Sequence, residues 1–580
     1  MDYLTITKRI KGGLKMKHKL SLVWLTSLVA IALIAACAPA PATPPTAPEP
    51  TKAAAAAAPA TAAPAAVQPT KAPAAAAKTK GGTLTVGLNQ EPPTMDPEAS
   101  PSAVTFQIIA GAAESLLFLD GDRKFKPWLA ESWEVSPDAT AYTFKLRKDV
   151  TFQDGTPFNA AAVKWNFDRV VDPNYKPGGA LASLTGYDST EVVDEYTAKV
   201  KFKAPNAPFL TYAASGPLAM VSPTATQKQG TDVNLKPVFT GGYQISEYVA
   251  KDHVTLTRWD GYKRRAPWSD QDGPGYLDKM IFKFIPETGT RMATVESGET
   301  QMVTDVPYTD VARFKTNKEL YIVTKPWVGA PLQWLLTVTK PPTDDLKVRQ
   351  AINLAIDRNA FLNTIYKDIA TYPVGPLTAA LFNDPSLPKI VFDQAKAKQL
   401  LDEAGWNKIG SDGIRTNKDG QRLELTLNSI DYGSGPQENV LLIQGQLRQV
   451  GIDVKLKTQA RPPWYEDNYK CANSGPVMLW RSGDWDGLFP LWDSRFVGSN
   501  FNWSCVKDPD LDKLLAAGQK ESDAAKRKQI YLDAEKLIAD KAYNVPLIDE
   551  LSVWAIRNNY QGLQFNGFTY PVFNDVYVTK

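Results

Sequence analysis

The sequence predicts an α/β protein whose folded part begins only after residue 80. From Gly81 onward, apolar and polar residues alternate over stretches of strand length, and stretches with helical spacing lie between them. Within residues 423–456, a strand, a helix and a second strand follow one another, which is the pattern of a βαβ unit. Because both patterns recur along the rest of the chain, the sequence favours the α/β class.

The composition of the 580 residues is typical of a folded protein. The chain has 15 Trp and 10% aromatic residues, too many for a disordered or fibrous protein. Its net charge of +3 comes from the first 80 residues, since residues 81–580 hold 55 Lys and Arg against 60 Asp and Glu. This mildly acidic part gives no support for nucleic-acid binding. Only one of the two histidines, His253, lies beyond residue 40, so no histidine-cluster metal site and no cofactor are expected there.

The first 37 residues have the pattern of a secretory signal. Basic residues precede an apolar run over 20–36, which ends at Cys37. The string 33–37 resembles the bacterial lipobox, in which the cysteine is lipidated and becomes the mature N-terminus. This resemblance predicts a lipid anchor on Cys37 that holds the protein at the outer face of the cytoplasmic membrane. A transmembrane anchor is the alternative, and Met16 is an alternative start of the chain.

Residues 38–80 are almost entirely Ala, Pro, Thr and Lys, with ten prolines. This composition cannot build a core, and the prolines recur too often for a continuous helix. It predicts a disordered, semi-extended tether of up to about 130 Å, at roughly 3.1 Å per residue. The expected topology is therefore a folded domain on a long tether outside the membrane.

Local patterns predict the elements of the folded part in chain order. Asn159 is the expected N-cap of a helix, and Gly405 and Gly451 are expected to end two others. The predicted strands cover 83–88, 141–147, 192–202, 254–259, 280–285, 423–427 and 453–456, and the predicted helices cover 159–171, 345–365, 392–404, 437–450 and 510–540.

Several short motifs follow one another between residues 81 and 580. They are E-P-P-T-M-D-P at 91–97, P-W-L-A-E-S-W at 127–133, F-Q-D-G-T-P-F-N-A at 152–160, V-R-Q-A-I at 348–352, A-I-D-R at 355–358 and A-G-W at 404–406. Together they resemble extracellular solute-binding protein family 5, the peptide and nickel receptors of bacterial ABC importers. We expect most of these residues to serve the fold, with Arg349 and Arg358 in surface or interlobe ion pairs.

The resemblance implies a two-lobed fold of the periplasmic-binding-protein type, class II, with an extra inserted domain and a ligand cleft between the lobes. Its first lobe would comprise 81–114, 238–328 and 546–580, its inserted domain 115–237, and its second lobe 329–545. The resemblance further implies a monomeric receptor that hands its solute to a membrane permease driven by a cytoplasmic ATPase.

The resemblance also places the ligand. The stretch 479–486 is similar to the family's ligand strand, and Asp484 stands where peptide-binding members pair an aspartate with the α-ammonium of the peptide. A buried ammonium needs such a carboxylate to offset its desolvation. The alternative is that Asp484 only caps a turn. The other residues expected at the site are Trp464, Trp480, Arg481, Ser482 and Trp485, although the tryptophans would also fit a plain core.

These observations favour a binding protein for peptides or peptide-like solutes. An oligosaccharide or opine-like solute is the alternative within the family, because aromatic side chains also suit sugar stacking. A secreted hydrolase is a remote alternative, and the sequence shows no phosphate loop, Ser-His-Asp arrangement or paired-cysteine zinc spacing. No enzyme activity is therefore expected.

Cys471 and Cys505 are the remaining cysteines of the exported part. An even pair in an oxidising compartment predicts a disulfide. Two buried, inert thiols are the alternative.

Overall fold

The computed structural model describes residues 78–579, apart from 101, 431–436 and 500. The predicted signal segment with Cys37 lies outside the described residues, as does nearly all of the predicted tether 38–80. The described chain combines helices with several separate sheets, which confirms the predicted α/β class.

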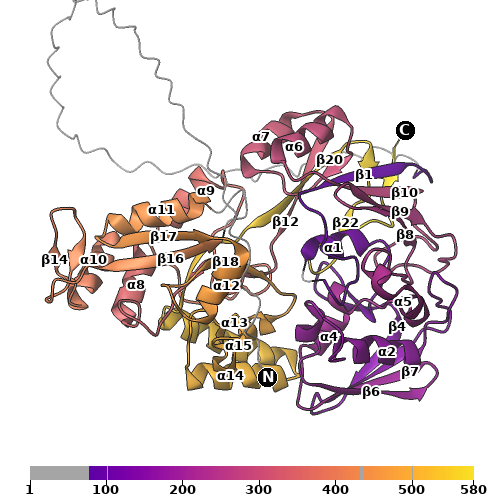
Figure 1. Ribbon diagram of the computed structural model, residues 1–580, viewed down its shortest axis with the longest axis horizontal. Helices are drawn as coiled ribbons and strands as arrows, with labels where there is room; N and C mark the ends of the chain where they lie inside the picture. The colour runs from indigo at the N-terminus through magenta and orange to yellow at the C-terminus, as the bar shows by residue number, and fades with distance from the viewer. Residues whose placement is uncertain (1–77, 101, 431–436, 500, 580) are drawn as a thin grey trace, which may run out of the picture. The chain divides into compact units, whose positions relative to one another are not determined.

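The largest sheet combines strands from three distant parts of the chain (Figure 1). In β1 every second residue is apolar, and Leu84, Val86 and Leu88 are each only 1% exposed. Its strands are β1 (Thr83–Leu88), β8 (Tyr243–Val249), β9 (His253–Arg258), β10 (Lys279–Phe284), β11 (Met302–Val303), β12 (Leu320–Pro326) and β20 (Leu551–Arg557). Their order in the sheet is β12-β20-β11-β1-β10-β9-β8, with β1 parallel to both β10 and β11.

A second, four-stranded sheet lies between these segments in the sequence. It consists of β4 (Ala130–Val135), β5 (Ala141–Leu146), β6 (Tyr187–Asp194) and β7 (Thr197–Phe202), in the order β4-β5-β7-β6. Helix α2 (Ala160–Val170) lies beside β6 and β7 in Figure 1, and the side chain of Asn159 caps it by accepting from Ala162 N. The predicted single strand 192–202 was wrong, because the chain reverses at Glu195 and Tyr196 and forms an antiparallel pair.

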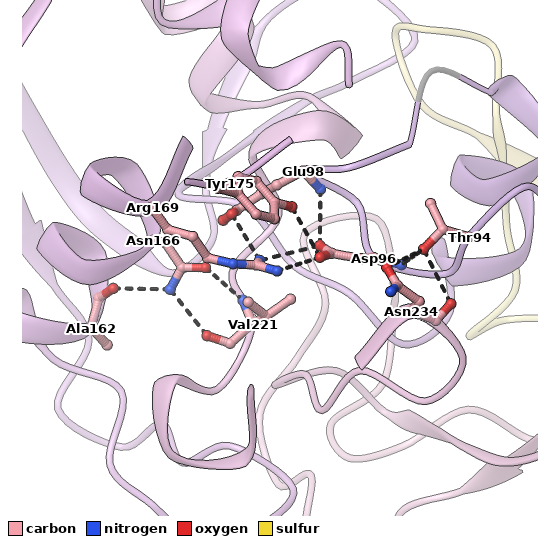
Figure 2. Close-up of polar contacts among 9 residues, drawn as sticks. All are labelled: Thr94, Asp96, Glu98, Ala162, Asn166, Arg169, Tyr175, Val221 and Asn234. Atoms are coloured by element: carbon pink, nitrogen blue, oxygen red, sulfur yellow. Dashed lines mark hydrogen bonds and ion pairs between the residues drawn. The ribbon is translucent and has the colours of Figure 1, made fainter. Parts of the chain in front are cut away.

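A buried ion-pair network attaches α2 to the turn that follows β1 (Figure 2). Arg169 of α2 pairs with Asp96 and with Glu98, at 2.9 Å to Glu98 Oε2, and Tyr175 donates to Asp96 Oδ2 at 3.0 Å. Asp96 and Glu98 are 0% and 1% exposed. The D-P turn of the sequence motif therefore serves the fold, because it joins the segment after β1 of the large sheet to the helix beside the four-stranded sheet.

The second half of the chain contains the predicted βαβ unit. Strands β16 (Glu424–Ile430) and β17 (Asp453–Gln459) run parallel in register, and α11 (Gln437–Arg448) lies between them in the sequence. A three-stranded sheet of β13 (Gly329–Leu335), β18 (Val477–Arg481) and β19 (Asn544–Ile548) adjoins it in the order β18-β13-β19. A parallel bridge between Asn428 and Pro476 connects the two sheets, so β16, β17 and β18 point the same way.

Two of the long predicted helices are in fact helix pairs. The stretch 345–365 divides into α8 (Leu346–Ala355) and α9 (Arg358–Thr364), because Ile356 is extended and the Asp357 side chain starts a new helix. The stretch 510–540 likewise divides into α14 (Pro509–Lys520) and α15 (Ala524–Asp540), with Asp523 as the second N-cap. Each break follows from a capping aspartate that offers the backbone an alternative hydrogen bond.

Arg349 and Arg358 make no ion pairs in the described part of the chain, contrary to the prediction. Both are buried and donate to backbone carbonyls instead. Arg349 Nε bonds Lys541 O at 3.0 Å, and Arg358 Nε bonds Pro546 O of β19 at 2.8 Å. Burial of each guanidinium lowers its pKa, to about 10 for Arg358. Their role is to hold chain segments around α8 and β19.

The remaining strands form four two-stranded sheets. The remaining helices are α1 (Ala103–Ile109), α3 (Ala180–Ser183), α4 (Phe209–Ala213), α5 (Pro223–Gln229), α6 (Thr288–Ser297), α7 (Tyr308–Thr316), α10 (Gln394–Glu403), α12 (Arg461–Tyr469) and α13 (Phe489–Trp492). The remaining strands are β2 (Leu117–Leu119), β3 (Phe125–Pro127), β14 (Lys408–Ile409), β15 (Arg415–Thr416), β21 (Tyr560–Gln561), β22 (Gln564–Phe565), β23 (Pro571–Val572) and β24 (Tyr577–Val578).

The chain passes twice between the seven-stranded sheet and the three-stranded sheet. One passage runs from β12 to β13, and the other from β19 to β20. They lie side by side, because Pro326 pairs with Leu551 and Trp327 N donates to Glu550 O at 2.8 Å. Buried apolar clusters are separate on the two sides: two are formed from residues 84–320 and 553–576, and two from residues 328–548. The fold is thus two-lobed, as the sequence predicted.

Candidate ligand-binding site

The carboxyl ends of three strands with the same direction meet at one edge of the second lobe. Strands β16, β17 and β18 end at Ile430, Gln459 and Arg481. In open α/β sheets, ligands bind in the crevice beyond such ends. Of the predicted ligand residues, Trp464 lies in α12 after β17, and Trp480 and Arg481 are the last two residues of β18. Ser482, Asp484 and Trp485 follow β18. Parallel topology therefore brings Trp464 and Asp484 to the same edge.

Asp484 is buried where three parts of the chain meet. As the N-cap of a 3₁₀ helix (Trp485–Leu488), its Oδ1 accepts from Asp486 N at 2.8 Å. Arg527 of α15 binds both carboxylate oxygens, with 3.0 Å from Nη1 to Oδ2. Thr211 Oγ1 of α4 donates to Oδ2 at 3.0 Å. Each oxygen thus accepts two hydrogen bonds, and the capping role is one of several.

A second carboxyl group, that of Asp486, lies within reach of the charges of Asp484 and Arg527. Burial favours the neutral form of Asp484, but the charge of Arg527 and the hydrogen bonds outweigh burial and lower its pKa. Asp486 is 3% exposed and accepts from Tyr531 OH at 2.8 Å. Burial, followed by the nearby charge of Asp484, raises the pKa of Asp486 to about 7. The cluster therefore has one carboxyl group that titrates near neutral pH.

Residues from outside the second lobe cover the loop around Asp484. They come from the segments near residues 123, 207 and 568. Arg123, between β2 and β3, donates to Gly483 O and, at 3.2 Å, to Gly567 O. A Cβ at Gly483 would lie 2.0 Å from Cε1 of Phe568, so this close approach requires glycine. Ala207 N donates to Gln519 O at 2.7 Å. The structure therefore represents a state in which the lobes touch at the predicted ligand loop.

Arg481 also reaches across to the first lobe. Its Nη1 donates to Phe568 O at 2.8 Å and to Thr569 Oγ1 at 2.9 Å. The guanidinium lies over the ring of Trp327, 3.9 Å from the centroid, and 5.0 Å from that of Tyr570. Burial lowers the pKa of Arg481. Ser482 is a local turn residue, whose Oγ donates to Asp484 O at 2.8 Å.

The three predicted tryptophans lie in the same lobe, but they do not line one common surface. Trp464 is 3% exposed and its ring lies 4.9 Å from Trp503, which is 5.2 Å from Phe501. The ring of Phe501 lies 4.2 Å from that of the partly buried Trp480, at an interplanar angle of 48°. Trp485 is anchored separately, because its Nε1 donates to Leu381 O at 3.0 Å. Trp464 is thus largely core, and Trp480 is the more exposed end of the aromatic row.

The structure joins Cys471 and Cys505 in a disulfide, with 6.2 Å between their Cα atoms. The bond attaches the residue just after α12 to the segment that carries Phe501 and Trp503. It therefore links α12, which carries Trp464, to the segment that carries Phe501 and Trp503.

Sequence reasoning missed Arg527 and Thr211, the two side chains that hold Asp484. A signal for Arg527 exists, because it shares the buried face of α15 with Tyr531, Ala534 and Ile538. An arginine on the apolar face of an amphipathic helix needs an acceptor inside the protein. Thr211 carries no comparable signal, since short polar residues are common near helix ends.

Two lobes joined by paired crossings, with charged groups where they meet, define a periplasmic-type solute-binding protein. The chain belongs to the bacterial extracellular solute-binding proteins of family 5, whose middle-region model matches residues 124–502. This confirms the family resemblance and places the chain among solute-binding receptors rather than enzymes. Within the described residues, no helix has the length and apolar character needed to cross a bilayer, and no group of three or more His, Cys, Asp or Glu side chains suits a metal ion.

Three similar proteins illustrate the relationship. The chain is 32% identical over 482 residues to the glutathione-binding protein GsiB of Salmonella choleraesuis. The aligned residues cover 81% of this chain and 89% of that protein. NikA from Brucella suis, in complex with Fe(III)-EDTA, has a TM-score of 0.76 at 25% identity, covering 86% and 100% of the two chains. DppA from Helicobacter pylori, in complex with the peptide STSA, has a TM-score of 0.72 at 24% identity, covering 87% and 99%.

Proposed function

We propose that this protein captures peptides or peptide-like solutes outside the cytoplasm and delivers them to the permease and ATPase of an ABC importer. The similarity to a glutathione-binding protein supports this proposal, because glutathione is a short peptide with a free ammonium group. The observation that carries it is the buried carboxylate of Asp484 at the contact between the lobes. We assign Asp484 as the anchor of the solute's ammonium group.

The contacts of Asp484 indicate how an ammonium would enter. Thr211 is a neutral donor to the ionised carboxylate, whereas an ammonium group would bring a full positive charge and form an ion pair with it. An ammonium therefore displaces the Thr211 hydroxyl when the lobes open and reclose. Arg527 stays, because it binds both oxygens and orients the carboxylate. Ionised Asp486 supplies the negative charge that balances the additional cation.

Calorimetric titration of peptides with free and acetylated N-termini tests this assignment. Asp484→Asn should weaken binding of free peptides by about 2–5 kcal/mol, which is roughly thirty-fold to several-thousand-fold. It should also abolish the preference for a free over an acetylated N-terminus. Thr211→Val is the control, since a displaced hydroxyl contributes nothing to the complex. Equal binding of free and acetylated peptides by the wild type would remove Asp484 from the site.

An oligosaccharide or opine-like solute is the second candidate. The partly buried Trp480, whose ring contacts that of Phe501 at a tilt, favours it as an aromatic surface for a sugar ring. In that case Trp480→Ala would abolish binding, and Asp484→Asn would have a mild effect. Mass spectrometry of the solute that co-purifies with the protein decides between the two.

The proposed receptor is a monomer, anchored through lipidated Cys37 and the tether 38–80. We propose a first lobe of residues 81–114, 238–328 and 546–580, an inserted domain of 115–237 and a second lobe of 329–545. The sheet memberships support this division except at the end of the second lobe. Because β19 pairs with β13 up to Ile548, we move that boundary from 545 to Ile548.

A further inference from the structure

The second lobe contains a cavity that is separate from the predicted ligand loop. Its volume is about 380 Å³, within the range of about 300–1,000 Å³ that is usual for small-molecule sites. It is lined by parts of α8, α10, β19 and the C-terminal end of α15, and by the loop segments 374–376 and 387–391. None of the predicted ligand residues and no residue of the first lobe lines it. The cavity is therefore not part of the candidate site described above.

The wall of this cavity is mostly apolar and is held in place. Its larger apolar side chains include Leu354, Leu387, Ile390 and Leu400.

The wall segment 374–376 is fixed by hydrogen bonds on both sides. Before it, Thr371 N donates to Asp549 O at 3.0 Å, and after it, Thr378 N donates to Gly329 O at 2.7 Å. Gly329 begins β13 and Asp549 directly follows β19, so both acceptors belong to the passages between the lobes. The cavity is therefore preformed, as most ligand sites are.

The charged groups of this cavity are all positive. Lys389 and Lys396 line it, and no Asp or Glu is among its described lining residues. By contrast, the cavities beside Asp120 and Arg169 each include two aspartates. Residues 81–580 hold 55 Lys and Arg against 60 Asp and Glu, so two lysines without an acid are a local exception. The cavity therefore favours an anion.

Neither lysine forms an ion pair with a carboxylate in the described part of the chain. Lys396 Nζ donates to Gln399 Oε1 at 3.2 Å, and Glu403 of α10 pairs with Lys347 instead. Both lysines that line the cavity are exposed. An exposed lysine on an apolar wall lays its aliphatic stem along that wall and keeps its ammonium group at the rim. Two ammonium groups are thus available at the mouth of the cavity.

One carboxyl group lies behind the wall. A Cβ at Gly375 would lie 2.8 Å from Glu535 Oε2. Glu535 is 0% exposed, and neither of its oxygens has a hydrogen-bond partner among the described residues. Burial raises the pKa of Glu535 well above its usual range, which favours the neutral form. Glu535 therefore does not offset the charge of the two lysines.

We propose that this cavity is a second ligand site, which binds a small apolar molecule that carries a carboxylate. The apolar part of the ligand lies against the aliphatic wall, and its carboxylate lies at the rim between Lys389 and Lys396. Gln350 adds a neutral donor, whereas the amide of Asn353 is already bonded to Asn544 O and Arg358. The inference goes beyond the proposed function, because it does not depend on which solute the cleft binds.

The test compares octanoate with octanamide by calorimetric titration of the full exported protein. Octanoate should bind more tightly, because the amide has the same chain but no charge. The double variant Lys389→Gln, Lys396→Gln should weaken octanoate binding about three- to thirty-fold and octanamide binding less than twofold. Lys347→Gln, Lys398→Gln is the matched control, since these lysines of α8 and α10 do not line the cavity and their loss should leave both affinities unchanged.

A second variant tests the location. Ala539 lines the cavity from α15, so Ala539→Phe should fill it and abolish binding of both probes. If Ala539→Phe lowers the melting temperature, Val391→Glu replaces it. Val391 is 53% exposed and lines the cavity, so its replacement leaves the fold intact and places a negative charge beside the two lysines. Val391→Glu should weaken octanoate binding more than threefold.

Several results would overturn the inference. A wild type that does not bind octanoate, or that binds acid and amide equally, excludes a site for apolar acids. Equal losses in the double variant and in the matched control would show a general effect of surface charge. Unchanged octanoate affinity in Ala539→Phe, or in Val391→Glu where that variant replaces it, would place the acid elsewhere on the protein. No peptide enters the test, so a failure of the proposed peptide specificity leaves its outcome unaffected.

Discussion

Replacing Arg527 by methionine should destabilise the protein far more than breaking an exposed ion pair. Arg527 and Asp484 have side chains only 11% and 10% exposed, and the guanidinium binds both carboxylate oxygens. Methionine fills a similar volume but leaves Asp484 with a neutral hydroxyl and one backbone N–H as partners. The carboxylate would then be a buried charge without a hydrogen-bonded cation, with only the more distant charge of Arg123 to offset it.

Removing one partner of a buried pair costs about 3–5 kcal/mol, whereas exposed pairs contribute about 0–1 kcal/mol. Arg265→Met is the matched control, because Arg265 and Asp272 lie 3.0 Å apart with side chains 58% and 71% exposed. The double variant Arg527→Met, Asp484→Asn should recover part of the loss, since it carries no uncompensated charge. Protonation of Asp484 in Arg527→Met should also shrink the deficit as the pH falls.

Urea unfolding of the ligand-free protein, followed by tryptophan fluorescence, gives the free energies of unfolding. The reasoning predicts a fall of several kcal/mol for Arg527→Met and less than 1 kcal/mol for Arg265→Met. A fall below 1 kcal/mol for Arg527→Met would refute it, as would a double variant less stable than Arg527→Met alone.

Three further predictions concern Asp486, the disulfide and the anchor. Because the pKa of Asp486 is raised to about 7 in the folded state, its contribution to stability is full below about pH 4 and is lost as the pH rises through 7. Between pH 5 and 7 the wild type should therefore lose about 2 kcal/mol more than Asp486→Asn, measured by urea unfolding at each pH. Removing the Cys471–Cys505 bond, which closes a loop with a sequence separation of 34, should lower the stability by about 4 kcal/mol on the chain-entropy model. An unchanged melting temperature in the double serine variant would contradict this. Finally, Cys37→Ser should release the protein into the medium, and membrane retention in cell fractionation would exclude lipidation at this residue.

Local features of the fold could be predicted because each depends on a few neighbouring residues. Asn159 caps its helix as expected, and Gly405 and Gly451 follow their helices with a φ of 88° each. The parallel pairing of β16 with β17 follows from a strand, helix and strand in sequence. The break at Ile356 and Asp357 escaped prediction, because the apolar spacing continues across it and only the backbone reveals the cap.

The sequence indicated which segment holds the candidate site, but not which side chains contact its residues. The resemblance placed Asp484 and Arg481 in the ligand loop, and the structure positions both where the lobes meet. Their partners are distant: Arg527 lies 43 residues from Asp484, and Thr211 lies 273 residues away. No local pattern indicates such pairs, because tertiary packing alone decides which buried polar groups meet.

The paired crossings between the lobes have a mechanical consequence. A single flexible connection would leave two bodies free to twist, slide and tilt. Two connections that are hydrogen-bonded side by side, at Pro326 with Leu551 and Trp327 with Glu550, resist sliding and twisting and leave mainly rotation about one axis. Every closure then returns the same surfaces to the same register. The closed cleft therefore has one shape, and a solute is retained according to how well it fits that single shape.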